Sequence, residues 1–233
     1  MNRSRKIETL LFDVSGVLID DIYTVWMADS DALEACGLER IESIEKFKEV
    51  FKLPIPEWCR SMGVPEDMMT KIEEEYRKAY PKYSGHIKIF PEVKRILEEF
   101  KKENYVMAIV SNILSSFLRE HLRRFGIDKY FTVVTGQNDC TEQKPSPRPI
   151  LITLEKLGSR PERSAYIGDM EEDIMAGKRA GVYTIGMCRD KSYHPLWKLK
   201  RQNPDFLISD LNELYSIIAR AKPRPWANED REA

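Results

Sequence analysis

The sequence predicts an α/β fold, with a Rossmann-like parallel sheet covered by helices on both faces and an all-helical cap inserted after the first strand. Two observations predict it. From about residue 86 onward, short apolar runs alternate with amphipathic segments, and repeated strand–helix units build parallel sheets. Residues 21–85, in contrast, carry helical periodicity alone. A chain of 233 residues is long enough for a large domain with a smaller one attached.

The first strand is expected over residues 7–13, which are rich in β-forming residues and leucine. The stretch LLFDVSGVLID places a carboxylate, Asp13, at the end of this strand. Ser15 follows two residues later, and Gly16 favours a turn. An acid at the end of an apolar strand is unusual unless the strand leads into a site.

The insert is expected to contain at least two amphipathic helices, because two of its stretches carry apolar residues at steps of three and four. The residues 53–56, LPIP, mark a break between the helices. We expect the methionine and tyrosine side chains of residues 60–80 to pack within the cap. The apolar positions are Ile41, Ile44, Phe47 and Phe51 in the first stretch, and Met69, Ile72, Tyr76 and Ala79 in the second.

Five more strands and five helices are expected after the insert, in alternation. The strands are predicted over residues 105–112, 130–136, 164–169, 182–187 and 205–209, and the helices over 91–103, 115–127, 147–158, 172–181 and 211–220. Ser115 or Ser116 is expected to cap the second of these helices. The predicted division is therefore an α/β core of residues 1–20 and 86–222, a cap of residues 21–85, and a disordered polar tail of residues 223–233.

Composition excludes several classes of partner. The net charge of −1 gives no general electrostatic attraction to nucleic acid or to an anionic membrane. No apolar run approaches the roughly 20 residues that span a bilayer, and the first residues lack the pattern of a signal peptide.

The four cysteines match neither a zinc site nor a redox pair, so reduced thiols in a cytoplasmic protein are expected. The oligomeric state is left open.

Polar side chains gather where the predicted strands end. Because the carboxyl ends of parallel strands meet at one edge of a sheet, these groups are expected to converge. Carboxylates bind Mg²⁺, a lysine neutralises phosphoryl oxygens, a serine donates to one of them, and a carboxylate can itself attack phosphorus. The set therefore suits phosphoryl chemistry. Its members are Asp13, Ser111, Asn112, Lys144, Asp169 and Asp173.

At these positions the chain resembles the haloacid dehalogenase superfamily, in its phosphoglycolate phosphatase-like branch with a helical cap after the first motif. FDVSGVLID resembles the first motif, AIVSN the second, KPSPRPI the third and IGDMEEDIMAGKRAG the fourth. One such match is weak, but four in the correct order at predicted strand ends are a strong signal. The resemblance covers the chain from Leu10 to about Arg220.

The resemblance implies a Mg²⁺-dependent hydrolase of small phosphorylated metabolites that works through an aspartyl-phosphate on Asp13. It implies that Mg²⁺ is held by Asp13, the Ser15 backbone carbonyl and Asp169, with Asp173 supporting the metal or Lys144. Ser111 and Lys144 are implied to bind the phosphoryl group. The candidate substrate-binding residues are Gly16, Ser111, Asn112 and Lys144, and the candidate catalytic residues are Asp13, Ser15, Ser111 and Lys144.

Ser15 departs from the pattern, because phosphatases of this superfamily usually carry a second aspartate there. That acid protonates the leaving oxygen and later activates water. A serine hydroxyl is neither an acid nor a base near neutral pH. Loss of a general acid costs on the order of 10²–10⁴-fold in rate.

Two other functions therefore stay open. The first is a weakly active or non-catalytic protein that binds phosphoryl groups. The second is a phosphonatase-like enzyme that cleaves carbon–phosphorus bonds, or a dehalogenase; the former needs a lysine from the cap, for which Lys46, Lys48 and Lys52 are candidates. In RDKSYHPLWKLKR, residues 189–201, we expect a connection or a contact with the cap rather than a nucleic-acid site, and we do not expect His194 to be a catalytic base.

Overall fold

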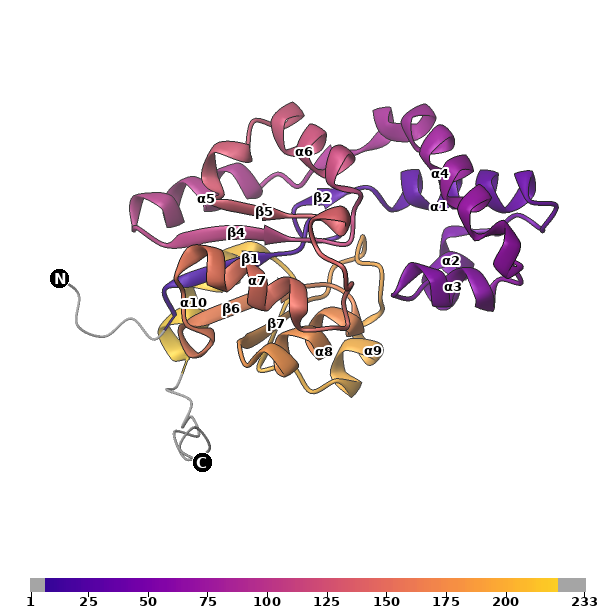
Figure 1. Cartoon of the computed structure of the whole chain (residues 1–233). Helices are drawn as coiled ribbons and strands as arrows, with labels where there is room; N and C mark the ends of the chain where they lie inside the picture. Colours follow the sequence, from indigo (N-terminus) through magenta and orange to yellow (C-terminus); the bar gives the residue numbers. More distant parts are fainter. Residues whose placement is uncertain (1–6, 222–233) are drawn as a thin grey trace.

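The structure, a computed structural model, describes residues 7–221, and they form the expected α/β fold (Figure 1). Six parallel strands form one sheet in the order β5-β4-β1-β6-β7-β8. The first strand of the chain therefore lies in the middle of the sheet. The strands are β1 (Thr9–Phe12), β4 (Val106–Val110), β5 (Val133–Thr135), β6 (Ser164–Gly168), β7 (Tyr183–Met187) and β8 (Phe206–Ile208).

Helices cover both faces of the sheet. Leu10 and Phe12 of β1 pack into the larger apolar cluster, which includes side chains of α5, α6 and α10, whereas Leu11 points into a second cluster with α7 and α8. This alternation is the period of two expected for a strand buried on both faces. The helices of the core are α5 (Val93–Lys102), α6 (Ser115–Arg124), α7 (Arg148–Leu157), α8 (Glu171–Ala180), α9 (Leu196–Arg201) and α10 (Leu214–Arg220).

The helical insert after β1 is as expected and consists of α1 (Ile22–Ala35), α2 (Ile44–Val50), α3 (Ile55–Ser61) and α4 (Met69–Tyr83). Helices α1 and α4 pack along each other, and the Tyr83 hydroxyl of α4 donates to Asp31 of α1 at 2.9 Å. Figure 1 shows the four helices grouped beyond the carboxyl ends of the strands. We call them the cap, and residues 21–85 remain its proposed limits.

A small antiparallel pair, β2 (Ile19–Asp20) and β3 (Lys88–Ile89), joins the cap to the core. The chain leaves the core through β2 and returns through β3, so the two segments that connect core and cap pair with each other. Strands of two residues carry no readable alternation, and the sequence did not predict them. Short 3₁₀ helices fill several connections, at Glu66–Met68, Ser84–His86, Asp128–Tyr130, Gln137–Asp139, Pro161–Arg163 and Leu211–Glu213.

One local expectation was wrong, and one helix was not expected. Neither Ser115 nor Ser116 caps α6, because the N-cap residue is Leu114; the Ser115 hydroxyl instead donates to Asp139 at 3.0 Å. The segment of residues 189–201 contains the helix α9, which was not predicted. The expected disordered tail lies outside the described residues. Within residues 7–221, no helix is both long enough and apolar enough to cross a bilayer.

Candidate active site

Asp13 lies directly after β1, at the carboxyl edge of the sheet. Its backbone N–H donates to Ile167 of the neighbouring β6 at 2.9 Å, which continues the strand pairing through this residue. One carboxylate oxygen, Oδ1, accepts from the Val14 N–H at 2.7 Å, and the side chain is buried. The central strand thus holds this acid in a fixed position.

Lys144 reaches Asp13 from the loop after β5. Its Nζ lies 2.9 Å from Asp13 Oδ2 and 2.7 Å from Asp173 Oδ1, and it donates to the Tyr166 hydroxyl at 2.8 Å. Burial alone would lower the pKa of this lysine, but the charges of Asp13 and Asp173 outweigh burial and raise the pKa. The ammonium is therefore a permanent positive charge next to Asp13.

Asp173 and Tyr166 hold Lys144 in place. Asp173 lies in the first turn of α8, where its Oδ2 accepts from the Met170 N–H at 2.9 Å while its Oδ1 faces Lys144. The Tyr166 hydroxyl donates to the Val110 carbonyl at 2.8 Å and accepts from the lysine. Both oxygens of Asp173 are thus engaged. Of the two alternatives from sequence, this arrangement favours support of Lys144 over contact with a metal.

Asp169 lies directly after β6 and is completely buried. Its Oδ2 accepts from the Tyr193 N–H at 2.5 Å, whereas its Oδ1 has no hydrogen-bond partner within residues 7–221. Gly16 approaches this carboxylate so closely that a Cβ at that position would overlap it, and its φ of +68° also favours glycine. The turn after Asp13 therefore closes over Asp169.

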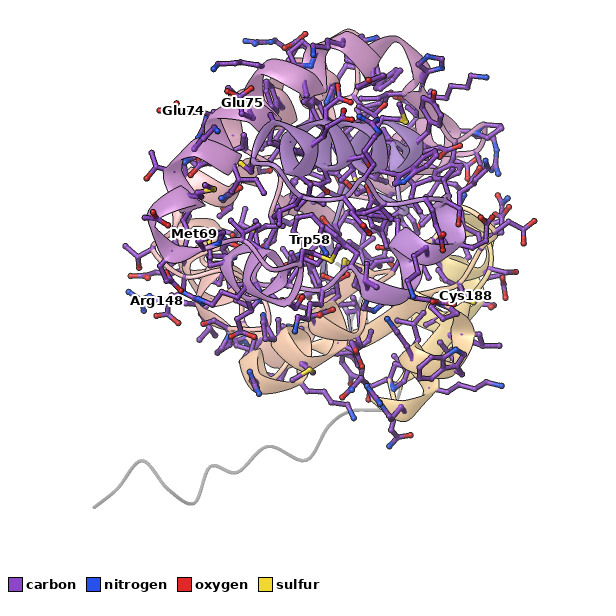
Figure 2. The ribbon with its side chains drawn as sticks, turned by 90° about the vertical axis from the view of Figure 1, so that its right-hand side faces the viewer. Trp58, Met69, Glu74, Glu75, Arg148 and Cys188 are labelled. Atoms are coloured by element: carbon purple, nitrogen blue, oxygen red, sulfur yellow. The ribbon has the colours of Figure 1, made fainter. Side chains whose placement is uncertain are left out.

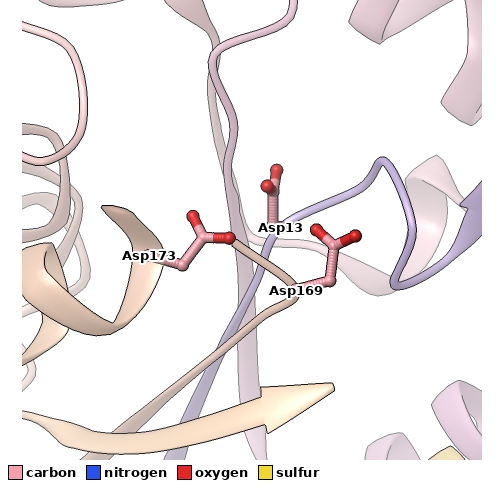
Figure 3. Close-up of side chains that lie close together, drawn as sticks. All are labelled: Asp13, Asp169 and Asp173. Atoms are coloured by element: carbon pink, nitrogen blue, oxygen red, sulfur yellow. The ribbon is translucent and has the colours of Figure 1, made fainter. Parts of the chain in front are cut away.

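The three aspartates form one acidic cluster (Figure 3). One ligand atom from each of Asp13, Asp169 and Asp173 lies within 4.8 Å of the others. Burial, followed by repulsion between the neighbouring carboxylates, raises the pKa of Asp169, and burial raises that of Asp13 despite Lys144. Three carboxylates and one ammonium leave an excess of two negative charges in a buried space. A hard dication balances this charge and also occupies the free Asp169 oxygen, so the donor set fits such an ion.

Ser15 points away from the acidic cluster, towards Asp21. Its hydroxyl donates to Asp21 Oδ2 at 2.7 Å, and Asp21 Oδ1 accepts from the Tyr193 hydroxyl at 2.9 Å. Asp21 is almost completely buried, and burial raises its pKa to about 7. Asp21 is at the N-cap position of α1, but its side chain makes no capping bond.

Ser111 and Asn112 follow β4, as expected, and both face the site. The Ser111 N–H donates to the Thr135 carbonyl at 3.0 Å, which fixes the end of β4 against β5. Asn112 Oδ1 accepts from the Lys144 backbone N–H at 3.4 Å, so the amide braces the loop that carries the lysine. The polar side chains that the sequence placed at the strand ends therefore lie at one edge of the sheet, whereas the Ser15 hydroxyl turns to Asp21.

A cavity of about 380 Å³ joins this edge to the cap. Its core end is lined by Asp13, Ser15, Ser111 and Asn112. Its cap end is mostly apolar, and Trp58 and Met69, both labelled in Figure 2, belong to it. Met69 and Tyr76 of α4 thus line a cavity as well as packing within the cap. Other residues of the cap end are Val25, Asp29, Phe51, Leu53, Ile55, Pro56, Cys59, Thr70, Ile72, Glu73 and Tyr76.

The cap is fastened to the core by two buried histidines. His194 Nδ1 accepts from the Glu171 N–H at 3.1 Å, so its Nε2 donates to the Phe51 carbonyl of the cap at 3.1 Å. On the other side, His121 of α6 lies 2.9 Å from the Tyr80 hydroxyl of α4. Burial lowers the pKa of each histidine to about 4, so both are neutral at pH 7. The contact of the 189–201 segment with the cap is therefore confirmed.

Comparison with known proteins identifies the family. A model of the haloacid dehalogenase-like hydrolases matches residues 10–187. Phosphoglycolate phosphatase of Aquifex aeolicus is 32% identical over 219 residues, which cover 90% of this chain and 95% of that protein. The pyrophosphatase PpaX of Oceanobacillus iheyensis is 27% identical, over 91% of this chain and 97% of that protein. A hydrolase from Pseudomonas syringae has a similar fold, with a TM-score of 0.80 at 20% identity, covering 92% of this chain and 99% of that one.

The chain belongs to the haloacid dehalogenase-like hydrolases. Within that family it is a hydrolase of the phosphoglycolate phosphatase-like type, with the helical cap inserted after β1, as the sequence motifs predicted.

Proposed function

We propose that this hydrolase is a Mg²⁺-dependent phosphatase of small phosphate monoesters that works through an aspartyl-phosphate on Asp13. The observation that carries the proposal is that Asp13, which lines the cavity, contacts Lys144 and belongs to one acidic cluster with Asp169. A nucleophilic carboxylate, a permanent cation and a free buried carboxylate oxygen are the groups that phosphoryl transfer requires. The phosphatase relatives support this choice of reaction.

In the first step, a carboxylate oxygen of Asp13 forms a bond to phosphorus while the bond from phosphorus to the leaving oxygen breaks. Lys144 stabilises the negative charge on the phosphoryl oxygens, and Ser111 donates a hydrogen bond to one of them. Asn112 and the turn at Gly16 complete the proposed binding site of the phosphoryl group. In the second step, water attacks phosphorus and Asp13 departs as a carboxylate. Asp173 and Tyr166 act through Lys144, which they orient.

The acidic cluster is the proposed site of Mg²⁺, with Asp13, Asp169 and the Ser15 carbonyl as its protein ligands and Asp173 at its edge. When bound, the ion supplies positive charge beside the phosphoryl oxygens. The unpartnered Oδ1 of Asp169 is the observation that favours this assignment.

Ser15 supplies no proton to the leaving oxygen, because its hydroxyl is not acidic and is donated to Asp21. Stable anions leave readily without a proton, whereas an alkoxide must take its proton from water and therefore leaves more slowly. The proposed enzyme is therefore fastest on activated substrates and slow in hydrolysing its own aspartyl-phosphate.

The phosphonatase-like alternative loses its support in the cap. Lys46 pairs with Glu49 on the surface and Lys48 donates to the Asp190 carbonyl. Among the described residues that line the cavity there is no lysine, so no amine is available to form a Schiff base with a substrate bound there.

Phosphate release from acetyl phosphate and p-nitrophenyl phosphate, measured with Mg²⁺ and with chelator, tests the proposal. Acid quenching during turnover, followed by mass spectrometry, should find phosphate on the peptide that contains residue 13. The Asp13→Asn variant should give neither phosphate release nor the modified peptide. If wild-type protein binds phosphate analogues but releases no phosphate, the non-catalytic alternative is correct.

A further inference from the structure

Within residues 7–221, the cap end of the cavity has no counterpart to Lys144, the cation that contacts Asp13 behind the lining of the core end. Among the described residues that line the cavity, none is lysine, arginine or histidine. The side chains with a carboxyl group at the cap end are Asp29 of α1 and Glu73 of α4. The other groups there are mainly apolar. A carboxylate or a second phosphate in this space would meet apolar surface and acids, with no cation to neutralise it.

Two polar atoms at the cap end lack partners. Asp29 is 6% exposed, and its Oδ2 has no hydrogen-bond partner within residues 7–221. Trp58 of α3 is 1% exposed, and its Nε1–H also has none. Buried polar groups are nearly always paired, and this acceptor and this donor both belong to residues that line one cavity, so a ligand in the cavity is a partner that the structure offers them. A hydroxyl group is both a donor and an acceptor.

We infer that the leaving group is an uncharged alcohol with an apolar body and a hydrogen-bonding hydroxyl at its far end. The phosphate lies at Asp13, the apolar body contacts the side chains between core and cap, and the far hydroxyl pairs with Asp29 or Trp58. This inference rests on the proposed function for the placement of the phosphate. The inferred substrate differs from those of relatives named for phosphoglycolate and pyrophosphate, because the leaving groups of those two compounds are anionic.

The test measures binding rather than turnover, so that it does not depend on catalysis. Three series of phosphonates with increasing chain length serve as probes: alkyl, ω-hydroxyalkyl and ω-carboxyalkyl, the last beginning with phosphonoacetate. A carbon–phosphorus bond is not cleaved by phosphatase chemistry. Calorimetry in Mg²⁺ gives the affinities. At the best chain length, the hydroxyalkyl compound should bind about fivefold tighter than the alkyl compound, and the carboxyalkyl compound at least about tenfold weaker than either.

Asp29→Leu should remove the advantage of the hydroxyl and leave the order of the alkyl and carboxyalkyl series unchanged. Asp31→Leu is the matched control, because Asp31 lies on the same helix but pairs with Arg40 and Tyr83 outside the cavity. If Asp29→Leu does not fold, the wild-type series still decides. The inference is overturned if a carboxyalkyl phosphonate binds as tightly as its alkyl counterpart, if the hydroxyl gives no advantage at any length, or if no probe binds. Absence of phosphate release with the expected order of affinities would overturn the proposed reaction alone.

Discussion

The two ends of the cavity differ in how their polar groups are paired. At the core end, charged groups are fixed by one another: Lys144 contacts Asp13, Asp173 and Tyr166, and glycine is required where the backbone meets Asp169. At the cap end, the lining is mostly apolar and the polar atoms of Asp29 and Trp58 are left without partners. Charge at the core end suits the phosphoryl group, which every substrate shares. In the proposed function only the leaving group touches the cap end, which is therefore free to differ among related enzymes.

The comparison predicts that changes at the core end affect all substrates, whereas changes at the cap end alter the preference among them. Figure 2 looks onto the cap. Trp58, which belongs to the cap end of the cavity, lies near the middle of this view, whereas Glu74 and Glu75 of α4 lie at its edge.

The largest effect is expected from Asp169→Ala. This change removes a buried carboxylate that the proposed ion requires, so turnover of every phosphoester should fall by about 10³-fold and Mg²⁺ affinity should fall with it. Calorimetry of Mg²⁺ binding and phosphate release measure the two. Asp31→Ala, an acid outside the cavity, is the control. Near-normal turnover of the variant in chelator would show that the metal assignment is wrong.

The next effect in size is a gain from Ser15→Asp. A carboxylic acid here can protonate an alkoxide leaving group, which should raise turnover of alkyl phosphates by roughly 10²-fold. The p-nitrophenolate ion needs no proton, so p-nitrophenyl phosphate should gain much less in the transfer step. Single-turnover rates on both substrates separate transfer from hydrolysis of the intermediate. An equal gain for both would mean that Ser15 shapes the loop rather than marking a missing proton donor.

A cation introduced at the cap end should change the preference between charged and uncharged ligands. Tyr76→Arg places a positive charge in the lining of the cavity and should shift the ratio of affinities for phosphonoacetate and ethylphosphonate by about tenfold towards the carboxylate. Glu74→Arg adds a positive charge to the exposed side of the same helix and should leave the ratio unchanged. If both variants shift the ratio equally, the effect is long-range attraction and the cavity lining does not set preference.

The smallest effect is expected on the pH dependence of stability, through the contact that His194 of the core makes with the cap. The pKa of His194 is lowered by burial to about 4 in the folded state, against about 6.5 in an unfolded chain, so the unfolded state binds more protons between these values. Its contribution to stability is therefore present above pH 6.5 and is lost as the pH falls towards 4. Because His194→Gln cannot titrate, it should lose about 1 kcal/mol less stability than wild type between pH 7 and pH 5.5. Urea denaturation at both values measures this. His86→Gln, at an exposed histidine, should behave as wild type.

The sequence predicted the sheet, the insert and the residues at the strand ends because these follow from local periodicity and from the geometry of parallel strands. It missed groups whose role depends on distant contacts. Tyr166 was interpreted only as part of a strand, although its hydroxyl holds Lys144. Asp21 and Tyr193 pair across 172 positions of chain, and no local pattern marks either of them. The orphaned Asp29 was likewise invisible, since burial against a cavity leaves no periodic signal.

The central position of β1 has a consequence for synthesis of the chain on the ribosome. Its neighbours β4 and β6 begin only at Val106 and Ser164, so the apolar strand Thr9–Phe12 emerges long before either edge can pair. The cap, whose helices α1 and α4 contact each other directly, emerges in between and can collapse first. For that interval β1 has two open edges, the state in which strands aggregate. We expect the nascent chain to need a chaperone until β6 has been made, well after the cap is complete.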